Sequence, residues 1–383
     1  MATYYCRLYK VFVKTEKPDI MAYLDDLLNP EDLMSNDIND KNFTITRNHE
    51  DLAPEQLAAY ESAVKTFLNK VQSTYWNICG QSPTYCYNTF QIPKRNGESR
   101  TINSPNDKMR KYQEKLLKHF AKLAKDCDCC WHHTNVYAYV KKRGCKDAIF
   151  KHQCNDSHYF LKLDFHKFFD NITPDFASRM IRQVFPFNLI QRNLYYDDFD
   201  ILKSAIEYCF LKNGLPQGAL TSPMLTNLIM LPFDYMMSNG LKNVFDEDKY
   251  VYTRYADDIL ISSQKPFSYS KVIKYVNKVL EDIEAPFQLN EEKTRYGSRA
   301  GRNWNLGIML NKDNDITVGH EAINQYKASA TNYLLDKKNG HPWDKKREDR
   351  FLGLRSYYYS IQYSRIREID EHLVEKFEYN PFS

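Results

Sequence analysis

Two short apolar stretches in the second half of the chain, residues 250–254 and 259–262, enclose the tetrapeptide Tyr255-Ala256-Asp257-Asp258. A strand, a tight turn and a second strand are the pattern of a β-hairpin. Residues 159–164 form another apolar run, which ends in Asp164. The pattern therefore predicts a buried strand with one carboxylate at its end and a hairpin with two carboxylates at its tip.

Apolar residues elsewhere recur at the spacing of amphipathic helices, over residues 52–67 and 108–125 and again from about residue 319 to the end. Thr173-Pro174 and Ser222-Pro223 mark two further helix starts. Threonine and serine are good N-caps, and proline suits the first helical turn. The chain is therefore expected to combine several helices with a few short strands.

A second hairpin and a glycine-containing loop complete the pattern. Residues 91–102 read as two strands joined by a turn at Asn96-Gly97, a favoured hairpin turn. Lys94 and Arg100 then flank this turn. Residues 214–218 carry two glycines, which allow a backbone to approach a ligand closely.

Length and composition narrow the function classes. The 383 residues fit two or three packed subdomains. No run of about 18 apolar residues and no secretion-signal pattern occur, so we expect a cytoplasmic protein without a membrane partner. The nine cysteines lack disulfide spacing, and zinc at residues 127–133 is disfavoured because a second ligand pair is missing. The net charge is only +4, so a nucleic-acid site must come from local basic patches.

The aspartates point to metal-dependent chemistry. Adjacent acids in a turn repel one another and cost stability, unless a divalent cation lies between them and a third acid. If Asp164, Asp257 and Asp258 converge on one sheet, their oxygens suit two Mg²⁺ ions, with Mn²⁺ as an alternative. Two-metal phosphoryl transfer is the chemistry of such a site. The alternative is that each acid is a surface turn residue.

The aspartates belong to a longer series of motifs. In order along the chain, these are Leu163-Asp164-Phe165-His166-Lys167-Phe168-Phe169-Asp170, Gly214-Leu215-Pro216-Gln217-Gly218-Ala219-Leu220-Thr221-Ser222-Pro223, Tyr255-Ala256-Asp257-Asp258, Leu289-Asn290-Glu291-Glu292-Lys293-Thr294 and Trp304-Asn305-Leu306-Gly307-Ile308. Over about residues 90 to 320 the series resembles the catalytic motifs of reverse transcriptases. The tyrosine at position 255 favours an RNA-directed DNA polymerase over viral RNA polymerases, which typically carry glycine there.

The resemblance implies a right-hand polymerase of the α/β (α+β) class, with fingers and palm around an antiparallel catalytic sheet, followed by a helical thumb. Residues 1–75 would form an N-terminal helical extension, 76–158 the fingers, 159–318 the palm with part of the fingers interleaved, and 319–383 the thumb.

The resemblance also assigns roles around the metal ions. Asp164 and Asp257 would be the main metal ligands and Asp258 a supporting acid, all three being catalytic, and Phe165 would join the metal site. Phe169 resembles the residue that excludes a ribose 2′-hydroxyl and so selects deoxynucleotides. Plain core packing is the alternative for Phe169.

A further set of residues would bind the incoming nucleotide. Arg100 suits triphosphate oxygens because its guanidinium forks, whereas Lys94 could equally be solvated. Gln217 would contact the nucleotide or the template, and Lys293 the leaving pyrophosphate unless it is only a surface charge.

RNA and primer contacts are expected near the C-terminus. Trp304 and Gly307 lie where reverse transcriptases carry the primer grip. Basic residues of the predicted thumb would contact RNA phosphates, the alternative being a solvated face. These residues are Lys345, Lys346, Arg347 and Arg355.

Among reverse transcriptases, the chain ends shortly after the predicted thumb, which fits bacterial stand-alone enzymes. Two elements typical of retron enzymes are altered here, at residues 147–152 and 305–307. We therefore expect an anti-phage defence enzyme that uses dNTPs to copy a cognate structured non-coding RNA into cDNA, with a branched RNA-DNA retron product as the alternative. Untemplated or protein-primed synthesis and a catalytically idle RNA-binding scaffold stay open, as do an effector protein or a second copy as partner.

Overall fold

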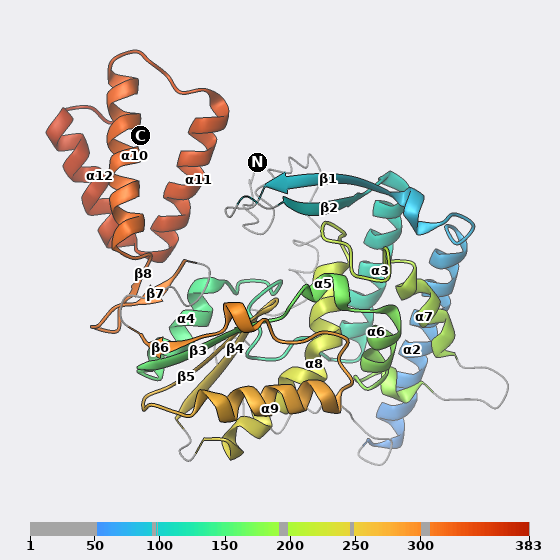
Figure 1. Cartoon of the computed structure of the whole chain (residues 1–383). Coiled ribbons are helices and arrows are strands. Elements are labelled where there is room, and N and C mark those ends of the chain that lie inside the picture. Colours follow the sequence, from blue (N-terminus) through green and yellow to red (C-terminus); the bar gives the residue numbers. More distant parts are fainter. Residues whose placement is uncertain are drawn as a thin grey trace.

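A four-stranded antiparallel sheet carries the strands predicted around the aspartates (Figure 1). The structure is a computed structural model and describes residues 52–93, 97, 99–190, 198–245, 249–299 and 307–382. The order across the sheet is β4-β5-β3-β6, with β4 spanning Tyr250–Tyr255, β5 Asp258–Ser263, β3 Tyr159–Asp164 and β6 Arg295–Ser298. The hairpin predicted over residues 250–262 and the strand predicted at 159–164 are both confirmed.

Helices cover both faces of this sheet. Alternate side chains of each strand point to opposite faces, and apolar side chains occur on both. Leu161 and Ile261 belong to a large core shared with α8, Ser222–Gly240, and α9, Tyr269–Asp282. The neighbouring Phe160 and Leu260 belong to a second core, which includes one residue of α4, Cys145–Cys154. The strands are therefore apolar on both sides, which accounts for their nearly continuous apolar sequence.

A second group of helices packs beside the sheet and supports a two-stranded hairpin (Figure 1). Four aromatic rings join these helices, with centroids 5.2 to 6.0 Å apart, and belong to Phe67, Phe120, Trp131 and Phe187. The predicted helices at 52–67 and 108–125 and the two strands of the predicted hairpin are confirmed, while Asn96 of its predicted turn lies outside the described residues. The elements are α2 Pro54–Trp76, β1 Tyr87–Pro93, β2 Ser99–Pro105, α3 Asp107–Asp126, α6 Pro174–Arg182 and α7 Phe199–Glu207.

The two predicted helix starts have different outcomes. Thr173 caps α6, because its hydroxyl accepts a hydrogen bond from the Phe176 amide at 3.2 Å. The predicted cap at Ser222 is wrong: Ser222 is the first residue of α8, and Thr221 precedes it with helical backbone angles. The Ser222 hydroxyl donates instead to the Pro216 carbonyl at 2.9 Å, so it closes the preceding loop.

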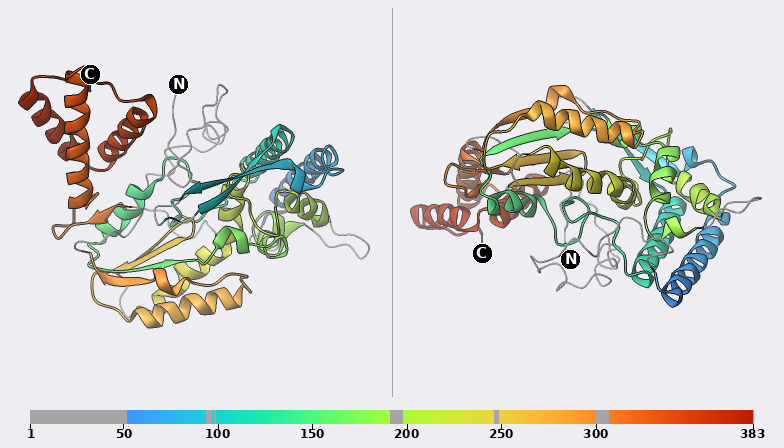
Figure 2. Two further views of the ribbon diagram at one scale, coloured as in Figure 1. Left: turned by 45° about the horizontal axis from the view of Figure 1, so that its top comes forward. Right: turned by 90° about the horizontal axis from the view of Figure 1, so that it is seen from below.

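Three C-terminal helices form a bundle that stands beyond one end of the sheet (Figure 2). They are α10 His320–Lys338, α11 Lys345–Ile361 and α12 Tyr363–Phe377, and they confirm the predicted helical C-terminus. The buried carboxylate of Asp370 holds them together. It accepts hydrogen bonds from the hydroxyls of Tyr326 at 2.5 Å and Tyr359 at 3.0 Å and from Arg355 Nε at 2.7 Å.

Short elements complete the described chain. They are η4 Pro83–Cys86, α5 Phe168–Asn171, η5 Phe187–Leu189, η6 Leu241–Asn243, η7 Glu291–Lys293, β7 Met309–Leu310 and β8 Ile316–Thr317. The cysteines of the described residues are all free thiols. Within the same residues, no helix has the length and apolar character needed to cross a bilayer. Of the predicted N-terminal extension, residues 1–51 lie outside the description.

A buried histidine joins α4 to the sheet. His152 is fully buried, and its ring nitrogens lie 2.5 Å from the Ser262 hydroxyl and 2.8 Å from the Thr253 hydroxyl. Burial, with a smaller contribution from Lys151, lowers the pKa of His152 to about 3 from its ordinary 6.5. The folded protein therefore keeps this ring neutral where the unfolded chain would protonate it.

This difference predicts an acid-dependent loss of stability. The unfolded state binds the extra proton between pH 6.5 and about 3, so the contribution of His152 is complete above pH 6.5 and falls as the pH drops through that window. Urea unfolding between pH 7 and pH 4.5 should show a smaller acid loss for His152→Gln than for the unchanged protein. The control is His372→Gln, which replaces a solvent-exposed histidine of α12 and should keep the original slope. Equal slopes for all three proteins would contradict the assignment.

Candidate active site

The strand register brings the three predicted aspartates together. Asp164, the last residue of β3, lies directly opposite Asp258, the first residue of β5. Asp257 precedes Asp258 in the turn from β4, and its carbonyl accepts a hydrogen bond from the Phe165 amide at 3.3 Å. The turn is tight because Ala256 adopts a left-handed conformation, with φ of +57°. The three carboxylates thus share one end of the sheet.

Two lysines partly neutralise this acidic cluster. Lys162 Nζ lies 2.9 Å from an oxygen of Asp258, and Lys293 Nζ lies 2.9 and 3.1 Å from the two oxygens of Asp164. Burial, together with the charges of Asp258 and Asp164, raises the pKa of Asp257 to about 7. Partial burial opposes the charge of Lys293, but its bonds to Asp164 outweigh this and raise the pKa of the ammonium group. Negative charge is therefore in excess around Asp257.

This charge excess fits a divalent cation, and carboxylate oxygens are the ligands that Mg²⁺ prefers. As the side chains lie here, however, no group of three or more His, Cys, Asp or Glu residues in the described ranges is arranged to hold a metal ion. The ammonium group of Lys293 occupies both oxygens of Asp164. A metal at Asp164 would therefore compete with that ammonium group for the same two oxygens.

Phe165 has no polar side-chain atom to offer a metal. Its ring is buried and packs against the rings of Phe168, Phe233 and Phe287, with centroid distances of 5.0 to 5.7 Å. Only the backbone carbonyl of Phe165 can serve as a ligand. The predicted metal contact at this position therefore reduces to one backbone oxygen.

Phe169 and the loop after α7 form one unit. Phe169 is buried in α5, and its carbonyl accepts a hydrogen bond from the Leu215 amide at 2.8 Å. Gly214 lies so close to α5 that a Cβ atom there would be 2.6 Å from the Asp170 carbonyl oxygen. The sequence predicted a glycine that allows close approach in this loop, and the neighbour it approaches is the backbone of α5.

The same loop also meets the β1–β2 hairpin. The Gln217 carbonyl accepts a hydrogen bond from the Asn103 amide of β2 at 2.8 Å. Arg100 lies three residues earlier on β2, opposite Ile92 of β1, whereas Lys94 falls outside the described residues. The hairpin thereby places the Arg100 strand beside the Gln217 loop.

Sequence reasoning missed the buried Gln113 of α3. Its amide donates to the Tyr87 hydroxyl at 2.7 Å and accepts from the Leu220 amide at 2.9 Å. It therefore connects the hairpin to the loop before α8. The sequence could have indicated this role, because Gln113 lies on the apolar face of an amphipathic helix. A polar side chain at such a position needs buried hydrogen-bond partners.

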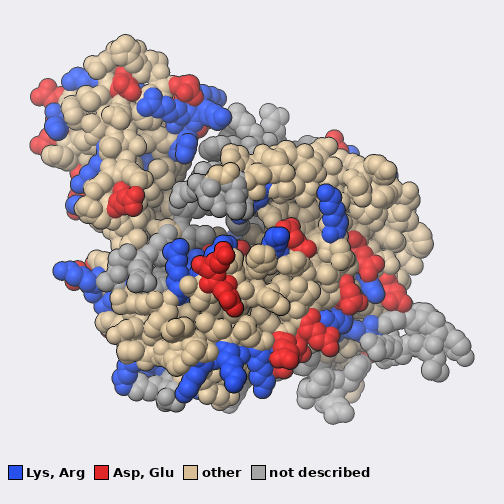
Figure 3. All heavy atoms as spheres, in the orientation of Figure 1, with Lys and Arg blue, Asp and Glu red and all other residues tan. Residues whose placement is uncertain are grey.

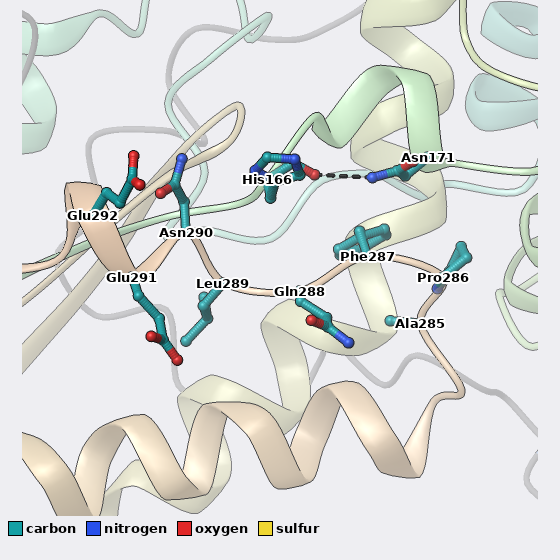
Figure 4. Close-up of a pocket in the computed structure, with 10 residues that line it drawn as sticks. All are labelled: His166, Asn171, Ala285, Pro286, Phe287, Gln288, Leu289, Asn290, Glu291 and Glu292. Atoms are coloured by element: carbon teal, nitrogen blue, oxygen red, sulfur yellow. Dashed lines mark hydrogen bonds between the residues drawn. The ribbon is translucent and has the colours of Figure 1, made fainter.

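A hollow of about 660 Å³ lies beside the Asp164 end of β3 (Figure 4). Its walls are His166, Asn171 and residues 285–292, and Asn171 donates to the His166 carbonyl at 3.0 Å. The Asn290 amide donates to the Asp164 carbonyl at 2.7 Å, which joins the hollow to the acidic cluster. No sequence pattern marked His166 or Asn171 as lining residues.

Comparison with known proteins decides the family. Residues 92–355 match the family described as "Reverse transcriptase (RNA-dependent DNA polymerase)". This chain is a member of the reverse transcriptase family. Membership, together with the antiparallel sheet and its helices, confirms the predicted α/β polymerase fold.

Relatives of this reverse transcriptase include retron enzymes. The Retron Ec73 reverse transcriptase of Escherichia coli is 29% identical, over 55% of this chain and 64% of its own length. The Retron Ec83 enzyme of the same species is 28% identical, over 67% and 79%, and the Retron Mx162 enzyme of Myxococcus xanthus is 26% identical, over 67% and 53%. Among solved structures, telomerase from Candida albicans with a telomeric RNA fragment aligns at a TM-score of 0.42 and 12% identity, over 78% of this chain and 57% of that one.

The residues predicted to contact RNA and primer have varied surroundings. Lys345, Lys346 and Arg347 are exposed in the first turn of α11, where basic side chains gather on the bundle (Figure 3). Arg355 instead bonds Asp370 inside the bundle. Gly307 precedes β7 with φ of +92°, while Trp304 lies outside the described residues.

The contact between Gly214 and α5 generates a stability prediction. Gly214→Ala should lower the free energy of unfolding by about 1–3 kcal/mol, because the added methyl group meets backbone that cannot rotate away. Gly353→Ala is the matched control: it lies inside α11 with open space around it and should stabilise by up to about 1 kcal/mol. Chemical denaturation measures both, and an unchanged midpoint for Gly214→Ala would show that α5 can move aside.

Proposed function

We propose that this chain is a reverse transcriptase of the retron type, which copies a structured non-coding RNA into DNA and leaves a branched RNA-DNA product. The observation that carries the proposal is the register that sets Asp164 opposite Asp258 and beside Asp257. Membership of the reverse transcriptase family and the retron names of its relatives support it. We therefore prefer the retron hypothesis to that of another defence enzyme, although the elements at 147–152 and 305–307 are altered. A role in anti-phage defence is part of the proposal.

In the proposed reaction, Asp164, Asp257 and Asp258 hold two Mg²⁺ ions, with Mn²⁺ as a substitute and the Phe165 carbonyl as an additional ligand. Such ions activate a primer hydroxyl and stabilise the charge that develops on the transferred phosphoryl group. Lys293 leaves the Asp164 carboxylate when the site is loaded. Its ammonium group, which here lies beside the acidic cluster, would then contact the leaving pyrophosphate.

The incoming dNTP would lie between the β1–β2 hairpin and the sheet. Arg100 and Lys94 contact its phosphates, and the loop at Gln217 contacts the base or the template. The hydrogen bond between Asn103 and Gln217 supports this arrangement, because it fixes the loop to the strand that carries Arg100. Phe169 contacts the sugar from α5.

The cognate RNA and the primer would bind along the C-terminal bundle and the segment before β7. Exposed Lys345, Lys346 and Arg347 suit RNA phosphates because they lie together in one helical turn. Trp304 and Gly307 contribute the primer grip. Arg355 acts indirectly, by holding the three helices together through Asp370.

The first experiment tests the aspartates. In an assay with poly(rA), oligo(dT) and dTTP, Asp257→Asn with Asp258→Asn should reduce incorporation by at least about 100-fold. RNA affinity should be unchanged, and the melting temperature should hold or rise because buried repulsion is removed. The control is Asp175→Asn, a surface aspartate paired with Arg179, which should keep full activity. Incorporation by the double variant at the control's rate would refute the metal assignment.

The product is tested in cells of the native host. RNA and DNA that co-purify with the chain should contain one structured RNA and a DNA copy joined to it, absent from the double asparagine variant. DNA without an RNA template would favour untemplated synthesis, and DNA that stays on protein after denaturation would favour protein priming. RNA alone, before and during phage infection, would favour an idle scaffold.

The contact proposed for Phe169 predicts a change in sugar selection. Phe169→Ala should raise the efficiency of ribonucleotide incorporation relative to dNTPs by roughly tenfold or more, because a smaller side chain leaves room for the 2′-hydroxyl. Phe168→Ala is the matched control: its ring is equally buried in α5 but stacks on Phe165, so it should reduce stability without changing the ratio. Equal ratios of ribonucleotide to dNTP incorporation for the two variants would show that Phe169 only packs in the core.

A further inference from the structure

A buried ion pair lies beneath the turn that carries two of the aspartates. Arg254 of β4 and Asp234 of α8 are both completely inaccessible to solvent. Arg254 Nε donates to one carboxylate oxygen of Asp234 at 2.7 Å, and Nη2 donates to the other at 2.6 Å. This two-pronged geometry fixes the plane of the guanidinium group.

The remaining arm of the guanidinium group reaches the turn itself. Arg254 Nη1 donates to the Ala256 carbonyl at 3.1 Å. Ala256 has a left-handed backbone, which is unfavourable for a residue with a Cβ atom, and it directly precedes Asp257. A single side chain therefore connects a rigid helix to the peptide that sets the direction of Asp257.

Other bonds hold both partners of this pair. The Tyr252 hydroxyl donates to Asp234 at 2.7 Å. The Arg254 amide donates to the Asn135 carbonyl at 2.9 Å, and the Arg254 carbonyl accepts from the Tyr137 amide at 3.0 Å. Three parts of the chain thus hold Arg254: Asp234 of α8 and the Ala256 carbonyl bond its side chain, and residues 135–137 bond its backbone.

Stability alone is a weak reason for this arrangement. Removing two charges from water is costly, and a well-packed apolar pair of similar volume often serves the folded state equally well. An apolar pair could not, however, bond the Ala256 carbonyl. Lysine could keep the charge but not three directed bonds, because its ammonium group lacks the planar fork.

We propose that Arg254 and Asp234 are positioning residues for catalysis: they hold the Ala256 peptide in its left-handed conformation and so aim Asp257 at the reacting phosphate. Neither touches substrate. The inference rests on the proposed function, since it concerns the same aspartates. It adds that catalysis needs a rigid turn at Ala256 as well as the three carboxylates.

The test compares Arg254→Lys with Arg299→Lys, at a second buried arginine whose aspartate partner is exposed. Arg299 also bonds one aspartate, Asp156 at 2.6 Å, and one carbonyl, that of Lys312 at 2.9 Å. It follows β6 beside the start of β3, at the opposite end of that strand from Asp164. With poly(rA), oligo(dT) and dTTP, Arg254→Lys should lower kcat by roughly 100-fold with little change in the KM for dTTP, because a displaced catalytic group affects the chemical step. Arg299→Lys should keep kcat within about threefold of the unchanged protein.

A second readout needs neither substrate nor metal. Hydrogen exchange at the amides of residues 256–258 should be faster in Arg254→Lys than in Arg299→Lys, while exchange in the C-terminal bundle stays the same in both. If Arg254→Lys does not fold, Tyr252→Phe decides the question. It removes only the hydroxyl bond to Asp234, and it should lower kcat about fivefold at unchanged KM when assayed well below its own melting temperature.

The results separate the two proposals. If the unchanged protein makes no DNA, the proposed function fails. If the unchanged protein is active and Arg254→Lys keeps its kcat and its slow exchange at the turn, the positioning role fails alone. A fall in kcat that merely follows a lower melting temperature, matched by Arg299→Lys, would also overturn the positioning role.

Discussion

The antiparallel register between β3 and β5 is the constraint on which the rest of the site depends. It sets Asp164 opposite Asp258, and a slip of one residue would turn every side chain of one strand to the other face of the sheet. The two cores make that slip costly, because Leu161 and Phe160 belong to different ones. The burial of ordinary aliphatic and aromatic side chains therefore fixes the relative positions of the three carboxylates.

The register also creates an electrostatic cost that the surrounding residues offset. Lys162 pairs with Asp258 and Lys293 with Asp164, while Asp257 keeps a raised pKa because burial and its two neighbours disfavour its charge. Burial would be expected to favour neutral side chains here. Three carboxylates at the end of a buried sheet do not favour folding. Their position is explained better by the binding of cations.

Much of this could be predicted from the sequence, because the signals were local. The β4–β5 hairpin, β3 and the helices with strong apolar periodicity were correct, since each depends on neighbours a few residues away. The cap at Ser222 was wrong because its hydroxyl bonds the Pro216 carbonyl instead of a helical amide. Gln113, His166 and the pair of Arg254 and Asp234 were not found, because their partners lie far away in the sequence and only the fold brings them together. The roles of Arg100, Gln217 and Phe169 rest on the family resemblance, because their partners would be nucleotide and template rather than parts of the chain.

The carboxylate of Asp370 has a consequence for how the C-terminal bundle moves. Donors from α10 and α11 converge on this single group of α12, so sliding any one helix by a turn would strand a buried charge. The three helices must therefore move together or not at all. Gln362, between α11 and α12, accepts from the Thr317 hydroxyl of β8 at 3.0 Å, and Lys146 of α4 donates to the Ser360 carbonyl at 2.9 Å. A rotation of the bundle about these two contacts would therefore displace all three helices as one rigid body, and most at its far end.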